Sequence, residues 1–202
     1  AEQLRRLRGG QVGIVLQNPM TCFDPLYRIG NQIAETFAAH QKWDAREIKE
    51  RSIEMLDKMQ IRNPEEALEK YPHQLSGGML QRIMIGIVMS MEPSLLIADE
   101  PTTALDVTIQ AQILDVLAKA QKETGAAVVL ITHDLGVVAE VSDKVAVMYA
   151  GRKVEEGSVE QILFNPQHPY TKALLKAVPR LDMGEQELSA IDGMPPDIIN
   201  PP

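Results

Sequence analysis

The chain has very little cysteine, few aromatic residues and no long apolar run. Cys22 is the one cysteine among 202 residues, so an internal disulfide is excluded and a reducing compartment is expected. Because only 4% of residues are aromatic, the core has to be built from Leu, Ile, Val, Met and Ala. The most apolar run, residues 83–91, is too short to cross a bilayer. The opening residues Ala1 to Arg6 lack the apolar stretch of a signal peptide, so we expect membrane contact only through a partner.

Positive charge is also scarce. The chain has 20 Lys and Arg against 28 Asp and Glu, which gives a formal net charge of −8. This excess of negative charge argues against general binding of nucleic acid, which needs clustered cations. It leaves room for docking on the cytoplasmic loops of a membrane protein, since such loops are rich in Lys and Arg. The hydrophobic and charged fractions, 45% and 24%, are ordinary for a globular protein.

Short apolar runs that alternate with helical periodicity predict an α/β fold. The expected strands are residues 12–16, 95–98, 127–131 and 145–149, and the expected helices include 29–59, 107–123 and 137–141. Strands that are apolar throughout are typical of a parallel sheet covered on both faces. A turn at Gly151 then leads into residues 154–157, a predicted hairpin return.

The same patterns divide the chain into four parts. We expect the end of a first core segment, a mostly helical subdomain, a second core segment and a C-terminal extension, at residues 1–17, 18–93, 94–164 and 165–202. Asn63 is the expected cap of a helix that begins with Pro64. Residues 178–202, rich in Pro, Asp and Gly, are predicted to form an extended appendage without a core of its own.

A Ser-Gly-Gly turn, Ser76 to Gly78, opens a predicted helix that continues through Gln81 and Arg82. Glycines allow backbone N–H groups to approach an anion closely, and a helix N-terminus favours negative charge. The turn can therefore hold a phosphate group. The alternative is a plain helix cap with Ser76 at the cap position.

An apolar strand, residues 95–98, ends in Asp99 and Glu100, followed by Pro101. An Asp at a strand end can hold Mg²⁺, usually with waters between. The adjacent Glu points the other way and can polarise a water molecule as a general base. The alternative is a solvated strand end.

Three further residues follow or precede predicted elements. Gln17 follows the first strand, Asp106 precedes the helix that begins at Val107, and His133 follows the strand 127–131. Each alone says little, because a lone His is usually structural and an Asp before a helix is usually its cap. At a strand end in line with Asp99, however, His133 could reach a phosphate oxygen.

Taken together and in this order, these motifs resemble the nucleotide-binding subunit of an ABC transporter. The resemblance implies ATP and Mg²⁺ as cofactors and a head-to-tail dimer of ATPase subunits. It also implies roles for single residues: Glu100 is the base, Asp99 holds the magnesium ion and Gln17 senses it. His133 is the switch at the γ-phosphate, and Asp106 links the two sites of the dimer. The signature motif, which contacts ATP bound to the opposite subunit, consists of Ser76, Gly77, Gly78 and Gln81.

Other segments resemble the ATPases of peptide and nickel importers in particular. They are Phe23 to Leu26, His168 to Thr171, and the Ile-Gly-x-Pro-Pro-like element at residues 191–196. This resemblance implies membrane-spanning permease subunits and a second ATP-binding subunit as partners, with a solute-binding protein involved indirectly. It implies a cytoplasmic location, peripheral on the inner face of the membrane, and no nucleic acid partner.

One family motif is absent: the sequence contains no G-x-x-x-x-G-K-[ST] loop. We therefore expect a truncated ABC-ATPase domain that does not hydrolyse ATP alone, although its parent would. Two alternatives stay open. A sheet that lacks strands exposes an edge, so the chain could be a self-associating module without nucleotide chemistry. An ABC-type DNA repair ATPase is disfavoured, because residues 17–75 show no sustained heptad.

Overall fold

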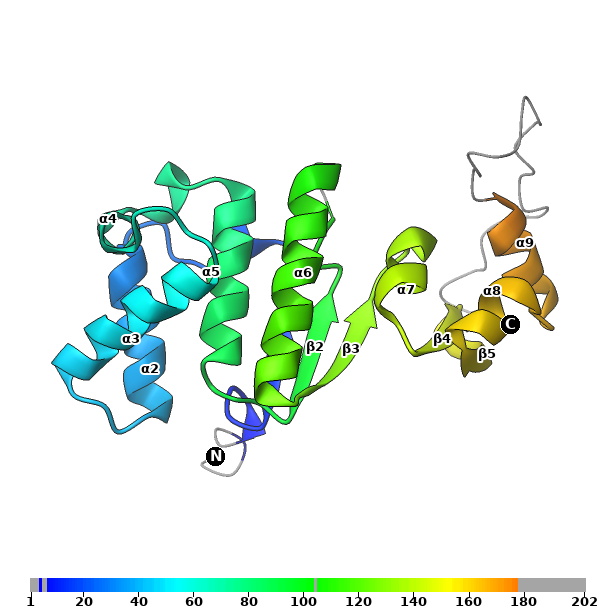
Figure 1. Ribbon diagram of the computed structural model, residues 1–202, viewed down its shortest axis with the longest axis horizontal. Coiled ribbons are helices and arrows are strands. Elements are labelled where there is room, and N and C mark those ends of the chain that lie inside the picture. Colours follow the sequence, from blue (N-terminus) through cyan, green and yellow to red (C-terminus); the bar gives the residue numbers. More distant parts are fainter. Residues whose placement is uncertain (1–3, 5–6, 104, 178–202) are drawn as a thin grey trace. The chain divides into compact units, whose positions relative to one another are not determined.

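The computed structural model describes residues 4, 7–103 and 105–177, and the chain divides into two compact units, residues 1–131 and 132–202. The first unit holds a parallel sheet packed against helices (Figure 1). Its strands, in the order β1-β2-β3, are Val12–Val15, Leu95–Asp99 and Ala127–Ile131. Both strand pairs are parallel, which confirms the predicted α/β architecture.

One face of this sheet carries the core of the first unit. The register aligns Val15 with Ala98, and both side chains are fully buried. Helices α5 (Gly77–Met89) and α6 (Val107–Thr124) supply the facing core side chains, among them Ile83 and Ile113. A Cβ atom at Gly13 would lie 2.3 Å from Cγ1 of Val88, so the close approach of α5 to β1 depends on this glycine.

The opposite face of the sheet remains half open. Ile14, Val129 and Ile131 are 49%, 47% and 47% exposed. The expectation of a sheet covered on both faces is therefore not met within the first unit. The reason is that its two long core helices, α5 and α6, pack together and supply core side chains for the same buried face.

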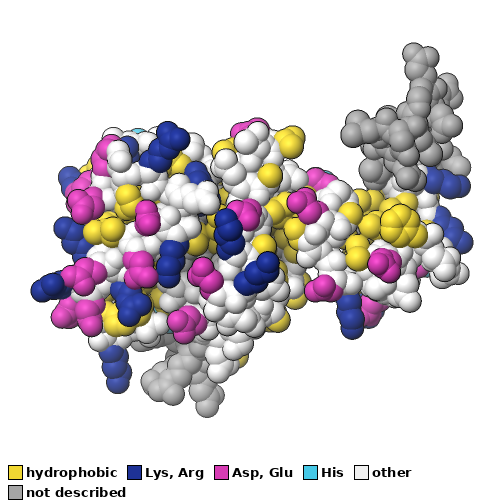
Figure 2. Space-filling view, in the orientation of Figure 1, with side chains coloured by type: hydrophobic (Ala, Val, Ile, Leu, Met, Phe, Trp, Pro, Cys, Tyr) yellow, Lys and Arg dark blue, Asp and Glu magenta, His cyan; other side chains and the backbone are white. Residues whose placement is uncertain are grey.

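The helical part of the first unit contains α2 (Ile29–His40), α3 (Ala45–Lys58), α4 (Pro64–Glu69) and two 3-10 turns, Pro19–Thr21 and Pro72–Gln74. The stretch predicted as helical is thus two helices, and a capping box of Asp44 and Glu47 begins the second. Charges of both signs are interspersed on the outside of these helices (Figure 2), several of them paired four residues apart.

Asn63 is the N-cap residue of α4, as predicted, but it caps the helix without its side chain. Pro64 does begin α4, but Asn63 makes no side-chain cap hydrogen bond. Its backbone lies in the left-handed region at φ 52°, and its side-chain amide donates to the carboxylate of Glu66 at 3.3 Å. The left-handed turn takes the side chain away from the free N–H groups that a cap would satisfy.

The second unit contains α7 (Leu135–Val141), β4 (Lys144–Tyr149), β5 (Arg152–Ser158), α8 (Val159–Phe164) and α9 (Pro169–Ala177). Strands β4 and β5 form an antiparallel hairpin, which confirms the predicted return after Gly151. The expectation that 145–149 belongs to the parallel sheet is wrong for the described residues, where β4 pairs with β5 alone. Helix α8 was not predicted, although Ser158 and Gln161 form its capping box.

The four-part division read from the sequence stays a prediction, and the appendage expected at 178–202 lies outside the described residues. In the part of the chain that the structure describes, every helix is too short or too polar to span a bilayer.

Candidate functional site

The carboxyl ends of β1 and β2 create the candidate site. Neighbouring parallel strands end at the same edge of a sheet, and ligands of open α/β folds bind beyond that edge. Asp99 is the last residue of β2, Glu100 follows it, and Gln17 lies two residues after β1. The fold thus delivers three of the predicted site residues to one edge.

Two side chains donate hydrogen bonds to the same oxygen of Glu100. The Gln17 amide nitrogen lies 2.8 Å from Oε2, and the Thr103 hydroxyl oxygen lies 2.8 Å from the same atom. Gln17 and Glu100 are 83 positions apart in the chain, so only the parallel pairing of β1 and β2 brings them together. Thr103 was not among the residues predicted from the sequence, since a Thr in a turn gives no signal of its own.

Glu100 has an unusual backbone. Its φ is 45°, in the left-handed region, which costs of order 1–3 kcal/mol for a residue with a side chain. Its N–H donates to the carbonyl of Ile131 at 2.8 Å, and its own carbonyl accepts from the N–H of Thr103 at 3.2 Å. These contacts hold the chain in a sharp turn directly after β2. Strained residues of this kind cluster at functional sites.

Asp99 suits a magnesium ion by its chemistry. It is partly buried at the strand end, and carboxylate oxygens are the ligands that this cation prefers. Within the described ranges no group of three His, Cys, Asp or Glu side chains forms a complete metal cluster. Mg²⁺ is usually held by one or two carboxylates together with phosphate oxygens and waters, so a single Asp at this strand end fits that pattern.

The signature residues lie at the N-terminus of α5. The Ser76 hydroxyl accepts a hydrogen bond from the N–H of Met79 at 3.3 Å, so Ser76 is the helix cap. Gly77 is exposed, whereas Gly78 is buried. A Cβ atom at Gly78 would lie 2.7 Å from Cγ2 of Ile109 in the first turn of α6. Gly78 therefore allows the two helix N-termini to pack closely, whatever else it does.

Asp106 caps α6, and its carboxylate accepts from the N–H of Ile109 at 3.0 Å. The cap interpretations of Ser76 and Asp106 are thus confirmed, and they are compatible with the phosphate and dimer roles, which stay predictions. Gln81 is only 1% exposed, and neither amide atom has a hydrogen-bond partner within the described residues. Its assignment to nucleotide binding also stays a prediction.

His133 belongs to the second unit, where it is exposed just before α7. The adjacent Asp134 caps that helix and accepts hydrogen bonds from the N–H groups of Gly136 and Val137 at 2.8 and 3.3 Å. Sequence reasoning missed this cap, although an Asp before an apolar helical run is a standard signal. The switch role of His133 stays a prediction.

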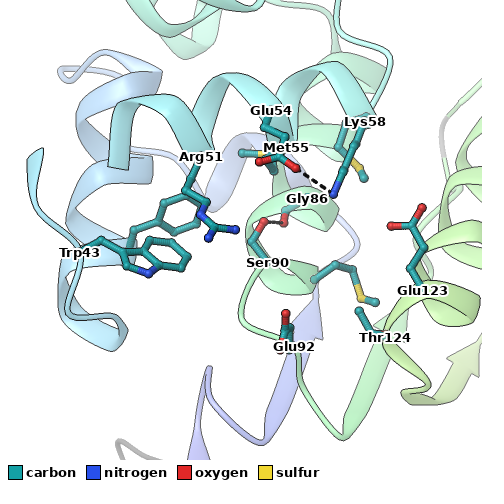
Figure 3. Close-up of a pocket in the computed structure, with 13 residues that line it drawn as sticks. Trp43, Arg51, Glu54, Met55, Lys58, Gly86, Ser90, Glu92, Glu123 and Thr124 are labelled. Atoms are coloured by element: carbon teal, nitrogen blue, oxygen red, sulfur yellow. Dashed lines mark hydrogen bonds and ion pairs between the residues drawn. The ribbon is translucent and has the colours of Figure 1, made fainter. Parts of the chain in front are cut away.

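The first unit also has a hollow of about 270 Å³ away from these residues (Figure 3). Trp43 lies against the guanidinium of Arg51, 5.1 Å from the ring centroid, and Lys58 pairs with Glu54 at 3.2 Å. The later turns of α3, α5 and α6 form its wall, and it contains none of the predicted site residues. The hollow is therefore separate from the carboxyl edge of the sheet.

Family models and curated relatives both identify the family that the motifs resemble. Residues 2–103 match the family model for ABC transporters, and residues 154–202 match that for the oligopeptide/dipeptide transporter C-terminal region. The dipeptide transport ATP-binding protein DppD of Bacillus subtilis is 50% identical over 201 residues, which are 100% of this chain and 60% of that protein. The oligopeptide transport ATP-binding protein OppD of the same organism is 48% identical over 100% of this chain and 56% of its own length.

Two solved structures of ABC transporter proteins have a similar fold. The protein cbiO1 from Clostridium perfringens, described as part of the ABC transporter complex cbiONQ, superimposes with a TM-score of 0.69 at 30% identity, over 81% of this chain and 63% of that one. The ATP-binding cassette MJ0796, in a dimer bound to ADP and Pi, superimposes with a TM-score of 0.67 at 26% identity, over 78% of this chain and 67% of that one. The chain spans only 56–60% of the two curated relatives. By its matched motifs and fold, this chain belongs to the ABC transporter family, and the curated relatives it resembles are oligopeptide and dipeptide transport ATP-binding proteins.

Proposed function

We propose that the chain is the greater part of the ATP-hydrolysing subunit of an importer for oligopeptides, dipeptides or nickel. The observation that supports this most strongly is the contact of Gln17 with Glu100 beyond β1 and β2. ATP hydrolysis needs an oriented water molecule and neutralised charge on the phosphate oxygens. A carboxylate held by an amide beside a second carboxylate is suited to both tasks.

Each residue has a distinct role in this proposal. Glu100 accepts the proton of the attacking water, Asp99 and the amide oxygen of Gln17 face the magnesium ion, and His133 contacts the γ-phosphate. The N-terminus of α5, from Ser76 to Gly78 with Gln81 behind it, faces ATP on the opposite subunit, because free N–H groups at a helix start attract anions. Asp106 links the two sites across the dimer.

The proposed partners are membrane-spanning permease subunits and a second ATP-binding subunit, identical or related, with a solute-binding protein acting indirectly. The names of the relatives support peptide transport, and the C-terminal match at residues 154–202 supports the peptide branch over an ABC-type DNA repair ATPase. The proposed location is the cytoplasmic side of the cell membrane, where the permease holds the subunit.

The test is a Glu100→Gln substitution in the complete subunit that carries this sequence. Loss of a general base lowers the rate by about 10²–10⁴-fold, so we expect kcat for ATP to fall by at least two orders of magnitude. ATP binding should persist, because the amide is nearly isosteric with the carboxylate. Glu160→Gln, at an exposed position on α8, is the matched control. A Glu100→Gln subunit that hydrolyses ATP at half the normal rate or faster would refute the assignment of the base.

A further inference from the structure

Thr103 contacts Glu100 twice from the turn that follows β2. Its N–H donates to the Glu100 carbonyl at 3.2 Å, and its hydroxyl donates to Oε2 at 2.8 Å. The backbone contact closes the turn, while the side-chain contact ties the end of the Glu100 side chain to that turn. Thr103 itself is partly buried, and the preceding residue, Thr102, is 7% exposed.

The second donor to Oε2 comes from a different part of the chain. Gln17 follows β1, whereas Thr103 follows β2, so the carboxylate is held from two directions. A glutamate side chain has several rotatable bonds and adopts many rotamers when nothing holds it. Two donors on one oxygen restrict those rotamers. A β-branched threonine is suited to this task, because its own χ1 is restricted.

We propose that Thr103 is a positioning residue for Glu100, whose hydroxyl, together with the Gln17 amide, keeps the carboxylate aimed at the attacking water. This inference rests on the proposed function, since it assumes that Glu100 is the base. Gln17 reaches Glu100 from a separate strand end, after β1, 83 positions away in the chain. Thr103 belongs to the same turn as Glu100 and stays with it. A base that is displaced slightly from its water loses much of its effect.

The experiment compares three substitutions in the complete subunit. Thr103→Val keeps the shape and removes the donor, Thr103→Ser keeps the donor, and Thr108→Val makes the same Thr-to-Val change at an exposed position on α6. We expect Thr103→Val to lower kcat about tenfold, the effect of one lost hydrogen bond to a charged group. KM for ATP should stay within about twofold, because the hydroxyl acts on the base and not on binding. Thr103→Ser should restore kcat, and Thr108→Val should leave it unchanged.

A second measurement is independent of turnover. In the nucleotide-free subunit, the side-chain amide signals of Gln17 in an NMR spectrum report its bond to Oε2. Thr103→Val removes the competing donor and should shift these signals, Thr103→Ser should return them, and Thr108→Val should not move them. A merely structural role for Thr103 would not produce rescue by serine in both kcat and these signals.

Separate outcomes distinguish failure of this inference from failure of the proposed function. Normal kcat in Thr103→Val beside an inactive Glu100→Gln subunit would overturn the positioning role alone. So would a Thr103→Ser variant as slow as Thr103→Val. Persistent hydrolysis in Glu100→Gln would overturn the proposed base, and the positioning role would fall with it.

Discussion

At the scale of single residues, Glu155 shows how one carboxylate fixes a whole segment. It lies on β5 and accepts hydrogen bonds from the N–H groups of Gln167 and His168, at 2.6 and 3.1 Å, just before α9. The buried hydroxyl of Thr171 lies beside it, and these neighbours lower the pKa of Glu155 below its ordinary value of 4.5. Of the three, the two amides have good hydrogen-bond geometry, whereas the Thr171 hydroxyl forms no regular bond within the described residues.

We predict that Glu155→Gln removes an acid-sensitive part of the stability of the second unit. Because the pKa is lower in the folded chain, the ionised carboxylate stabilises folding above pH 4.5, and this contribution is lost as the pH falls through the folded pKa. Urea unfolding at a series of pH values, followed by circular dichroism, measures it. The wild-type chain should lose more stability on acidification than Glu155→Gln, and Glu160→Gln should behave as wild type. Equal slopes for all three chains would show that the contact contributes nothing.

The residues of the site differ in how far the sequence predicted them. Asp99 and Glu100 stand out because an apolar strand ends in two carboxylates. Thr103 was missed, since its contact with Glu100 depends on a turn whose conformation begins with a left-handed Glu100. Local sequence rules give no reason to expect a positive φ at a glutamate. The contact between Gln17 and Glu100 was not predicted, because the resemblance named Gln17 only as a sensor of Mg²⁺ and the parallel pairing of β1 with β2 brings the two residues together.

At the scale of elements, two helix starts were predicted to the residue, because caps are local. Ser76 and Asp106 both cap helices as expected. Pairing between strands was predicted less well. The apolar run at β4 has the composition of a buried parallel strand, but its hairpin connection to β5 decides its partner. A short connection favours antiparallel pairing whatever the composition of the strand.

The contact between α5 and α6 allows a prediction about Gly78 that is separate from nucleotide chemistry. Gly78→Ala should destabilise the first unit by about 1–3 kcal/mol, because the new methyl group would lie 2.7 Å from Cγ2 of Ile109. Combining it with Ile109→Ala, which removes that atom, should cost less than the sum of the two single changes. Urea unfolding followed by fluorescence of Trp43, the one tryptophan, measures all variants.

Gly77→Ala is the control for this prediction, since nothing lies within 4 Å of a Cβ atom at that position. It should leave stability nearly unchanged. Strict additivity of Gly78→Ala and Ile109→Ala would mean that α5 and α6 adjust freely, and the packing role of Gly78 would be wrong.

At the scale of the whole molecule, the parallel sheet was predictable and its covering was not. Alternating apolar runs and helices predicted the parallel strands β1, β2 and β3 correctly. Which face each helix covers depends on tertiary packing, and here α5 and α6 share one face while Ile14, Val129 and Ile131 stay half exposed on the other. Exposed apolar sheet residues of this kind favour association between copies, the alternative that the sequence left open.

The last prediction concerns the 202-residue chain by itself. Titration calorimetry with ATP and Mg²⁺ should detect no binding, because the sequence has no G-x-x-x-x-G-K-[ST] loop to surround the phosphates with N–H groups and a lysine. The residues proposed as base, metal carboxylate and sensor amide at the carboxyl edge contribute little positive charge to attract a nucleotide. The DppD protein of Bacillus subtilis is the positive control.

Light scattering on the same sample tests the alternative, self-association of the chain. A measured mass above that of the monomer, lowered by the substitution Val129→Lys, would support association through the open sheet face. Clear binding of ATP by a monomer would contradict both expectations, because Gln17, Asp99 and Glu100 would then build a nucleotide site without the missing loop.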